Sequence, residues 1–164
     1  MKTKRLTFLA MATAAAMVLS YVESLIPPLM AVPGMKMGLP NIMIVFVLYS
    51  LNWRDALAVS LVRVVLASLL FGTVLSLAYS LAGAIISLAG MILLKRTEKF
   101  SPVAVSVTGG VLHNAAQIGV ACLVMETNLI AYYLPFLVLS GTVAGILIGF
   151  AAAFLVGRVK FELR

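Results

Sequence analysis

Six long apolar segments, separated by short polar or charged breaks, set the pattern of the chain. They cover approximately residues 6–27, 38–51, 56–71, 73–94, 101–125 and 133–157. An α-helix rises about 1.5 Å per residue, so about 20 apolar residues cross the hydrocarbon core of a bilayer. The second segment is short for a perpendicular crossing, which would suit a start inside the membrane from a re-entrant loop. The pattern predicts an all-α, six-transmembrane-helix bundle.

The composition is that of an integral membrane protein. Hydrophobic residues make up 63% of the chain and charged residues 10%, and the mean hydropathy is +1.17. Six spans over residues 1–164 would form a single membrane domain and leave no room for a soluble catalytic module. The basic start and first apolar run could also be a signal peptide, but five further segments follow, which favours an uncleaved first helix. Cys122 is the only cysteine, so no internal disulfide forms, and we interpret it as a packing residue.

Lysine and arginine positions orient the six predicted spans. With a cytoplasmic N-terminus, ten of these residues lie on the cytoplasmic side and only Lys36 lies outside, in agreement with the positive-inside rule. The ten are Lys2, Lys4, Arg5, Arg54, Lys95, Arg96, Lys99, Arg158, Lys160 and Arg164. Both termini are therefore predicted to be cytoplasmic. We interpret the net charge of +7 as an orientation signal that can attract anionic lipid, and not as a sign of nucleic-acid binding.

Polar residues interrupt the third and fifth apolar segments. His113, Asn114 and Gln117 share one broad helix face, because positions 113 and 117 lie one turn apart and 114 lies about 100° round. An unpaired imidazole or amide in hydrocarbon costs several kcal/mol, so this face must meet protein, water or a ligand. Arg63 lies near the middle of the third segment, where an arginine costs about 2.5–3.5 kcal/mol on insertion scales. Such an arginine usually marks a ligand or an ion pair.

The predicted topology places Glu23, Lys36 and Asn41 toward the outer side. Together with Arg63 and the polar face of the fifth segment, they could line a cavity that opens to the outside. Such a cavity favours an anion, a carboxylate or phosphate on a larger apolar body. Each residue also has a structural interpretation. Arg63 could form a salt bridge with Glu23, or its charged group could snorkel to the membrane surface. Glu23 could instead pair with Lys36, and Lys36 could also be a solvated charge. His113 could serve helix packing.

The first helix carries two overlapping small-xxx-small pairs, Ala10 with Ala14 and Ala12 with Ala16. Small residues at this spacing give a smooth surface on which another helix can lie closely. That helix could belong to the same bundle, or it could belong to a separate membrane subunit that docks here.

Four motifs, in order along the chain, resemble those of a known family. They are residues 9–27 (LAMATAAAMVLSYVESLIP), 35–41 (MKMGLPN), 60–63 (SLVR) and 109–114 (GGVLHN), and the resemblance covers nearly the whole chain. The chain resembles the Gx transporter family, whose members are often labelled heptaprenyl diphosphate synthase component I. That family is similar to the substrate-binding S components of energy-coupling factor (ECF) transporters. Pro40 stands where the family pattern usually has alanine, which could shift the start of the second helix.

The resemblance implies six helices, an outward-facing pocket and a multi-pass position in a bacterial plasma membrane. It implies that Ala10 and Ala14 dock a transmembrane coupling subunit. The chain would then bind a small, anionic or amphipathic compound, vitamin-like or isoprenoid-related, and separate ATPases would energise its uptake.

No catalytic motif accompanies these features. The sequence contains no Walker A loop, no HExxH pair and no Cys/His metal cluster, so we expect neither an enzyme nor a bound cofactor. Prenyl diphosphate synthases hold Mg²⁺ through clustered aspartates, whereas Asp55 is the only aspartate here. Two alternatives to transport remain. The chain could be a non-catalytic membrane partner of a prenyl diphosphate synthase, or a scaffold for an extracytoplasmic flavin/quinone redox assembly.

Overall fold

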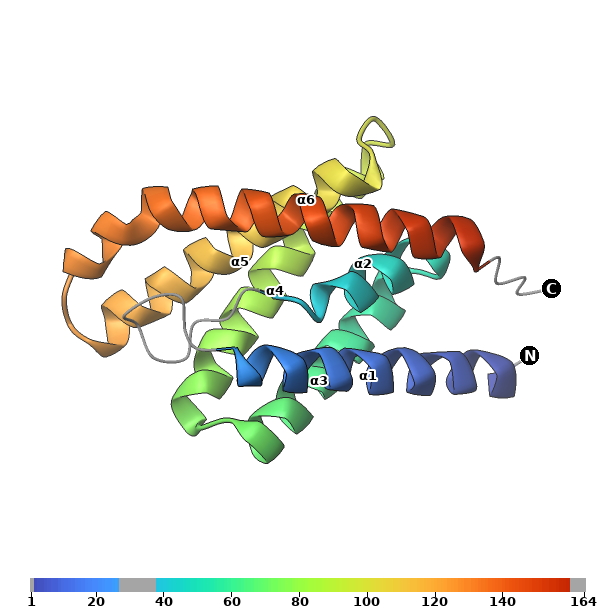
Figure 1. The fold of residues 1–164 in the computed structure, drawn as a ribbon, viewed down its shortest axis with the longest axis horizontal. Coiled ribbons are helices and arrows are strands. Elements are labelled where there is room, and N and C mark those ends of the chain that lie inside the picture. The colour runs from blue at the N-terminus through green and yellow to red at the C-terminus, as the bar shows by residue number, and fades with distance from the viewer. Residues whose placement is uncertain (1, 27–37, 160–164) are drawn as a thin grey trace.

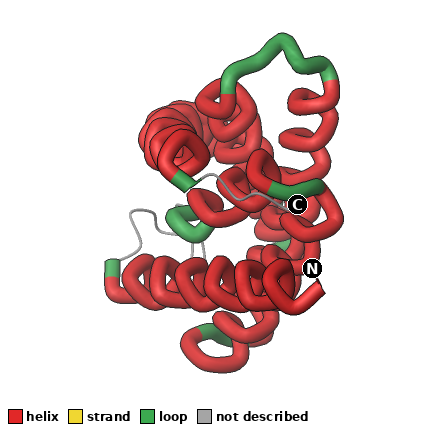
Figure 2. Tube along the Cα trace, turned by 90° about the vertical axis from the view of Figure 1, so that its right-hand side faces the viewer, coloured by secondary structure: helices red, strands yellow, loops and turns green. Residues whose placement is uncertain are grey.

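The computed structural model describes residues 2–26 and 38–159, and this part of the chain is all-α, as predicted (Figure 1). That all six helices cross the membrane stays a prediction. Short loops join the helices of residues 38–159 (Figure 2). The described helices are α1 (Lys2–Leu25), α2 (Asn41–Ser50), α3 (Trp53–Phe71), α4 (Val74–Arg96), α5 (Pro102–Val124), the 3-10 helix η1 (Leu129–Tyr133) and α6 (Leu134–Arg158). Each α-helix lies on one of the six predicted apolar segments, with ends that differ from the predicted ones by a few residues.

Polar side chains fix where three of the helices begin. The side chain of Asn52 accepts a hydrogen bond from the Asp55 backbone N–H (3.0 Å), which starts α3 three residues before the predicted position 56. Thr73 and Ser76 form a reciprocal capping box at the start of α4. Ser101 caps α5 in the same way as Asn52 caps α3. These short polar breaks are therefore helix starts as well as loops.

The short helix α2 lies at the centre of the bundle. Its ten residues correspond to a length of about 15 Å. Five successive residues, from Ile44 to Leu48, are buried, so this helix is covered on every side. It contacts α1, α3, α5 and α6. Because protein surrounds α2, its length does not have to match the thickness of the bilayer.

Helices α5 and α6 approach each other most closely along a row of glycines on α6. A Cβ atom added at Gly145 would lie 2.6 Å from the Cα atom of Val107, and one added at Gly149 would lie 2.7 Å from the Cα atom of Val103. Gly141 lies against the carbonyl of Gly110 in the same way. The three glycines are spaced four residues apart, which places them on one face of α6. This row joins the two helices backbone to backbone.

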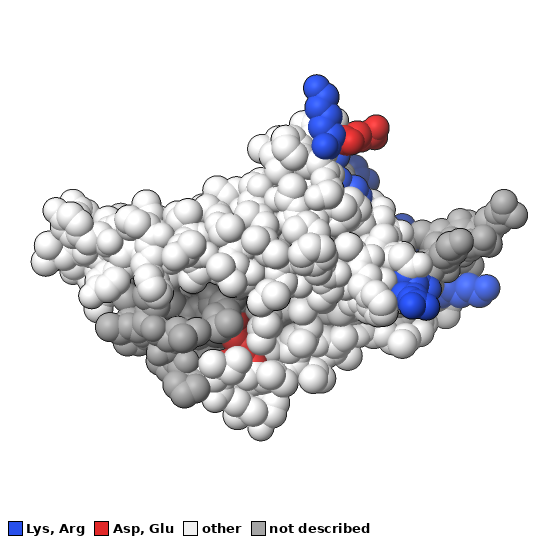
Figure 3. Space-filling model, turned by 45° about the horizontal axis from the view of Figure 1, so that its top comes forward, with Lys and Arg blue, Asp and Glu red and all other residues white. Residues whose placement is uncertain are grey.

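The chain is a multi-pass membrane protein. Within residues 2–26 and 38–159, the helical stretches that are long and apolar enough to cross a membrane are Thr3–Leu25, Val74–Arg96, Pro102–Val124 and Leu129–Arg158. Helix α2 is shorter, and α3 carries three charged residues. Large apolar side chains cover much of the surface, as expected for a surface in contact with lipid. In Figure 3 the visible basic side chains lie on a projection at the top and at the right-hand end of the molecule, while most of the surface is white.

Candidate functional site

Buried polar side chains line the contact between α4 and α5. We call Ser80 and Ser87 of α4, with His113 and Gln117 of α5, the α4–α5 polar seam; all four are buried. A Cβ atom added at Gly83 would lie 2.7 Å from the His113 imidazole, so the ring lies directly against the backbone of α4. Gln117 follows His113 by one turn on the same face. The sequence pattern predicts the α5 half of this seam but not the α4 serines.

Two members of the α4–α5 polar seam have polar atoms that the described residues do not satisfy. The side-chain nitrogen of Gln117 and the hydroxyl oxygen of Ser87 are buried and have no hydrogen-bond partner within that part of the chain. A buried polar group without a partner costs about 1–3 kcal/mol. Groups of this kind are therefore available to a polar ligand that reaches them.

Asn114 joins α5 to α6. Its side-chain nitrogen donates a hydrogen bond to the Leu137 carbonyl (2.9 Å) and lies 3.4 Å from the Ser140 hydroxyl. The added Cβ position of Gly141 is 2.9 Å from the same nitrogen. Asn114 therefore takes part in helix packing, and its contact with a ligand stays a prediction.

Arg63 is buried in α3, with 4% of its surface exposed. Its Nε and Nη2 atoms are buried and have no hydrogen-bond partner in the described residues. The negative charge of Glu23 acts favourably on the guanidinium. The low exposure excludes the interpretation that Arg63 snorkels to the surface.

Glu23 and Asn41 organise the chain that leads into α2. The Glu23 carboxylate accepts hydrogen bonds from the backbone N–H of Gly38 (2.5 Å) and of Leu39 (3.3 Å). Gly38 has a φ of +89°, a conformation that glycine adopts without strain. Asn41 is buried, and its side-chain nitrogen lies 3.1 Å from the position of an added Gly38 Cβ atom. Lys36, predicted to lie beside these residues, falls outside the described part of the chain.

The predicted site residues therefore form two groups. Arg63 and Glu23, which holds the start of α2, form one group, whereas His113 and Gln117 belong to the α4–α5 polar seam. Helices α3 and α5 have no close backbone contact, and α4 packs against both. The single cavity expected from the sequence would require the Arg63 guanidinium and the α4–α5 polar seam to meet across α4. That cavity stays a prediction.

The first-helix alanines separate into a buried pair and an exposed pair. Ala12 and Ala16 are buried inside the bundle, and Ala10 and Ala14 are exposed. Of the two pairs, Ala10 and Ala14 are therefore the one that another subunit could reach.

Acidic residues do not gather into a metal site in the described part of the chain, where no group of three or more His, Cys, Asp or Glu residues could hold an ion. Asp55 has a structural partner. Arg5 donates two hydrogen bonds to its carboxylate, at 2.6 and 3.1 Å, and this ion pair ties the start of α1 to the start of α3. The sequence pattern predicts only an orientation role for Arg5.

Comparison with known proteins identifies a family. A family model described as heptaprenyl diphosphate synthase component I matches residues 12–155, which confirms the resemblance drawn from the four motifs. No curated protein matches the chain. No solved structure matches it.

Proposed function

The chain belongs to the heptaprenyl diphosphate synthase component I family, and on that premise we propose that it is a membrane-embedded substrate-binding subunit of an uptake system. In this proposal six helices cross a bacterial plasma membrane and both termini are cytoplasmic. The ligand is a small anionic or amphipathic compound that enters from the outer side. A separate coupling subunit and ATPases drive its transport, as in transporters with S components.

The observation that carries the proposal is the buried guanidinium of Arg63. Two of its nitrogen atoms have no hydrogen-bond partner in residues 2–26 and 38–159. Burying a charge is costly unless the charge is paired and hydrogen-bonded, and the Glu23 carboxylate also holds the backbone of Gly38 and Leu39. A ligand carboxylate or phosphate would supply the acceptors that the guanidinium needs, in the forked geometry that arginine favours.

Two further observations support the proposal. The side-chain nitrogen of Gln117 offers a second buried donor that the described residues leave unpaired. The exposed pair Ala10 and Ala14 offers a smooth surface on α1 for a coupling subunit.

The test uses compounds that co-purify with the detergent-solubilised protein, identified by mass spectrometry. The wild type is expected to retain a compound, and Arg63→Met is expected to retain at least about tenfold less, because a charge-assisted hydrogen bond contributes about 1.5–3 kcal/mol. The matched control is Arg54→Gln, which removes an exposed arginine that lies over the Trp53 ring. Equal retention by wild type and Arg63→Met, or no retained compound in the wild type, would contradict the proposal.

The family description favours a second candidate function, a non-catalytic membrane partner of a prenyl diphosphate synthase. In that case the chain would hold a prenyl compound for a soluble enzyme. Affinity purification from native membranes distinguishes the two functions. Recovery of a prenyl synthase without ATPase subunits supports the partner role, and recovery of ATPase and coupling subunits supports uptake.

A further inference from the structure

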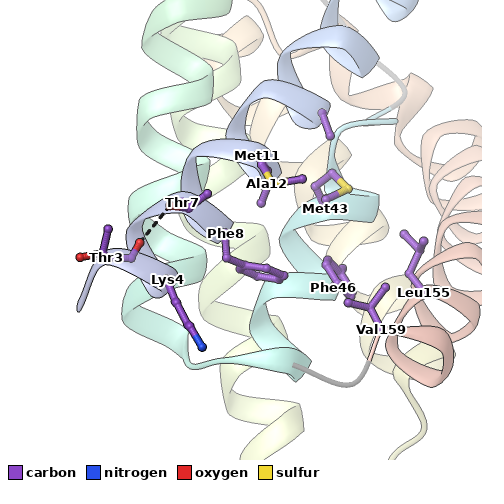
Figure 4. A pocket seen from close by; sticks show the side chains of 11 residues that line it. Thr3, Lys4, Thr7, Phe8, Met11, Ala12, Met43, Phe46, Leu155 and Val159 are labelled. Atoms are coloured by element: carbon purple, nitrogen blue, oxygen red, sulfur yellow. Dashed lines mark hydrogen bonds between the residues drawn. The ribbon is translucent and has the colours of Figure 1, made fainter. Parts of the chain in front are cut away.

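A groove separates α1 from α6 at the end of the molecule where α1 begins and α6 ends. The two helices make no close backbone contact, and α2 forms the floor between them. The cavity between them measures about 700 Å³, within the range of roughly 300–1,000 Å³ found for small-molecule sites. We call it the α1–α6 groove (Figure 4). Its lining residues are Thr3, Lys4, Thr7, Phe8, Met11, Ala12, Ala15, Met43, Phe46, Leu155 and Val159.

The walls of the α1–α6 groove suit a hydrocarbon chain. Phe8 of α1 projects toward Phe46 of α2, and their ring centroids are 5.6 Å apart (Figure 4). Met11 and Met43 add flexible apolar side chains that adapt to the shape of a ligand. Leu155 lies on the opposite side, from α6.

The polar residues of the described lining are at the end of the groove formed by the first turns of α1. Lys4 is the charged residue in the described lining, and it lies between Thr3 and Thr7 along the helix. The Thr7 hydroxyl donates to the Thr3 carbonyl (3.0 Å), so it serves its own helix. The neighbouring Arg5 is bound to Asp55. The groove therefore presents one positive charge at the end of an apolar channel.

We infer that the α1–α6 groove binds one anionic phospholipid, with its phosphodiester at Lys4 and an acyl chain between α1 and α6. A phosphodiester carries one negative charge, which a single lysine matches. A prenyl diphosphate carries more charge and needs several cations or a metal ion, whereas the described lining provides a single lysine. Basic pockets between membrane helices on the cytoplasmic side are known to hold anionic headgroups.

This lipid site is separate from the site in the proposed function. Arg63 and Gln117 do not line the groove, nor do the exposed alanines Ala10 and Ala14. The lipid would fill the space between two helices that have no close backbone contact, and would thereby stabilise the position of α1 relative to α6. Loss of the lipid and loss of an Arg63 ligand can be measured independently in the same preparation.

The test is native mass spectrometry of the purified full chain, titrated with phosphatidylglycerol or with phosphatidylcholine that has the same acyl chains. The wild type is expected to bind one phosphatidylglycerol more tightly than phosphatidylcholine. Lys4→Gln should weaken phosphatidylglycerol binding about fivefold and leave phosphatidylcholine unchanged, because one lysine near an anionic headgroup contributes about that factor. Lys99→Gln is the matched control, an exposed lysine outside the groove lining.

A second variant tests the hydrocarbon part of the groove. Ala15→Leu adds volume to the wall without changing charge, and it should weaken the binding of both lipids. Thermal unfolding checks that this variant is folded. If it is not folded, the Lys4→Gln measurement alone tests the inference. Equal affinity for the two lipids, or equal effects of Lys4→Gln and Lys99→Gln, would overturn the inference. Displacement of phosphatidylglycerol by a lower concentration of farnesyl diphosphate would overturn it in favour of a diphosphate site.

Discussion

At the scale of single residues, Gly83 sets the position of His113. The imidazole lies where a Gly83 side chain would be, so the two residues can be close only because α4 has a glycine at this point. The neighbouring serines Ser80 and Ser87 keep the same face of α4 small and polar. The position of the ring is therefore a property of α4 as much as of α5.

Gly83→Ala is expected to destabilise the protein by about 1–3 kcal/mol, because the added methyl group must displace the His113 ring. The intrinsic helix preference for alanine over glycine, about 1 kcal/mol, opposes this cost only in part. The control Gly119→Ala has no atom within 4 Å of the added Cβ atom and should be neutral or slightly stabilising. Unfolding in mixed micelles measures the free energies. Since His113 is the single histidine, nitrogen NMR of its imidazole reports the displacement directly.

The sequence indicates which polar residues are buried, but it does not show which groups they contact. Arg63, His113 and Gln117 are buried, as mid-membrane polar residues on inward faces must be. The Asn114 bond to the Leu137 carbonyl could not be predicted, because it depends on how α5 and α6 are placed. The Gly83 contact with His113 joins residues 30 positions apart for the same reason. A helix period shows which residues share a face but not what that face meets.

At the scale of helices, the row of Gly141, Gly145 and Gly149 joins α6 to α5. The sequence carries a signal for it, since the three glycines recur every four residues, the same spacing that was noted for the first-helix alanines. The atoms that face Gly145 and Gly149 include backbone atoms of α5, which cannot rotate away as a side chain can. This contact therefore fixes the distance between the two helix axes.

Gly145→Ala is expected to separate α5 from α6 and to lower the free energy of unfolding by an amount near the upper end of the range of about 1–3 kcal/mol for overpacking. The matched control on the same helix is Gly157→Ala, where nothing lies within 4 Å of the added Cβ atom. Steric trapping in lipid bicelles would give both values. Similar stability for the two variants would show that the glycine row does not set the helix contact.

Helix lengths were predictable to within a few residues, and the central place of α2 was not. The break after residue 51 and the start near Pro40 limit the second helix to a short segment. Its burial on all sides depends on contacts with four other helices. The unbroken apolar run from Ile42 to Leu48 is equally typical of a helix that faces lipid.

At the scale of the whole molecule, two contacts of basic side chains lie at one end. Arg5 binds Asp55 there, and Lys95 donates a hydrogen bond to the Leu48 carbonyl near the end of α2. The first turn of α1 and the last turn of α6 lie at this same end (Figure 1). This arrangement is what the proposed cytoplasmic position of both termini requires.

The two ends of α5 should react from opposite sides of the membrane. In a Cys122→Ser background, a membrane-impermeant maleimide should label Asn128→Cys in intact cells, and should label Lys99→Cys only after the membrane is permeabilised. Both residues are exposed, and the 23 residues of α5 lie between them. Labelling of both cysteines in intact cells would show that α5 does not cross the membrane in the proposed direction.

Helix α1 is bound to the rest of the chain near both of its ends. Its 24 residues form a rod of about 36 Å. Arg5 holds Asp55 near one end, Glu23 holds the backbone of Gly38 and Leu39 near the other, and no close backbone contact ties the rod to α6. A partner that tilts the first turns of α1 would therefore pull on the entrance to α2 at the far side, with α2 and α3 as the pivot. One helix would act as a lever between the two faces of the membrane.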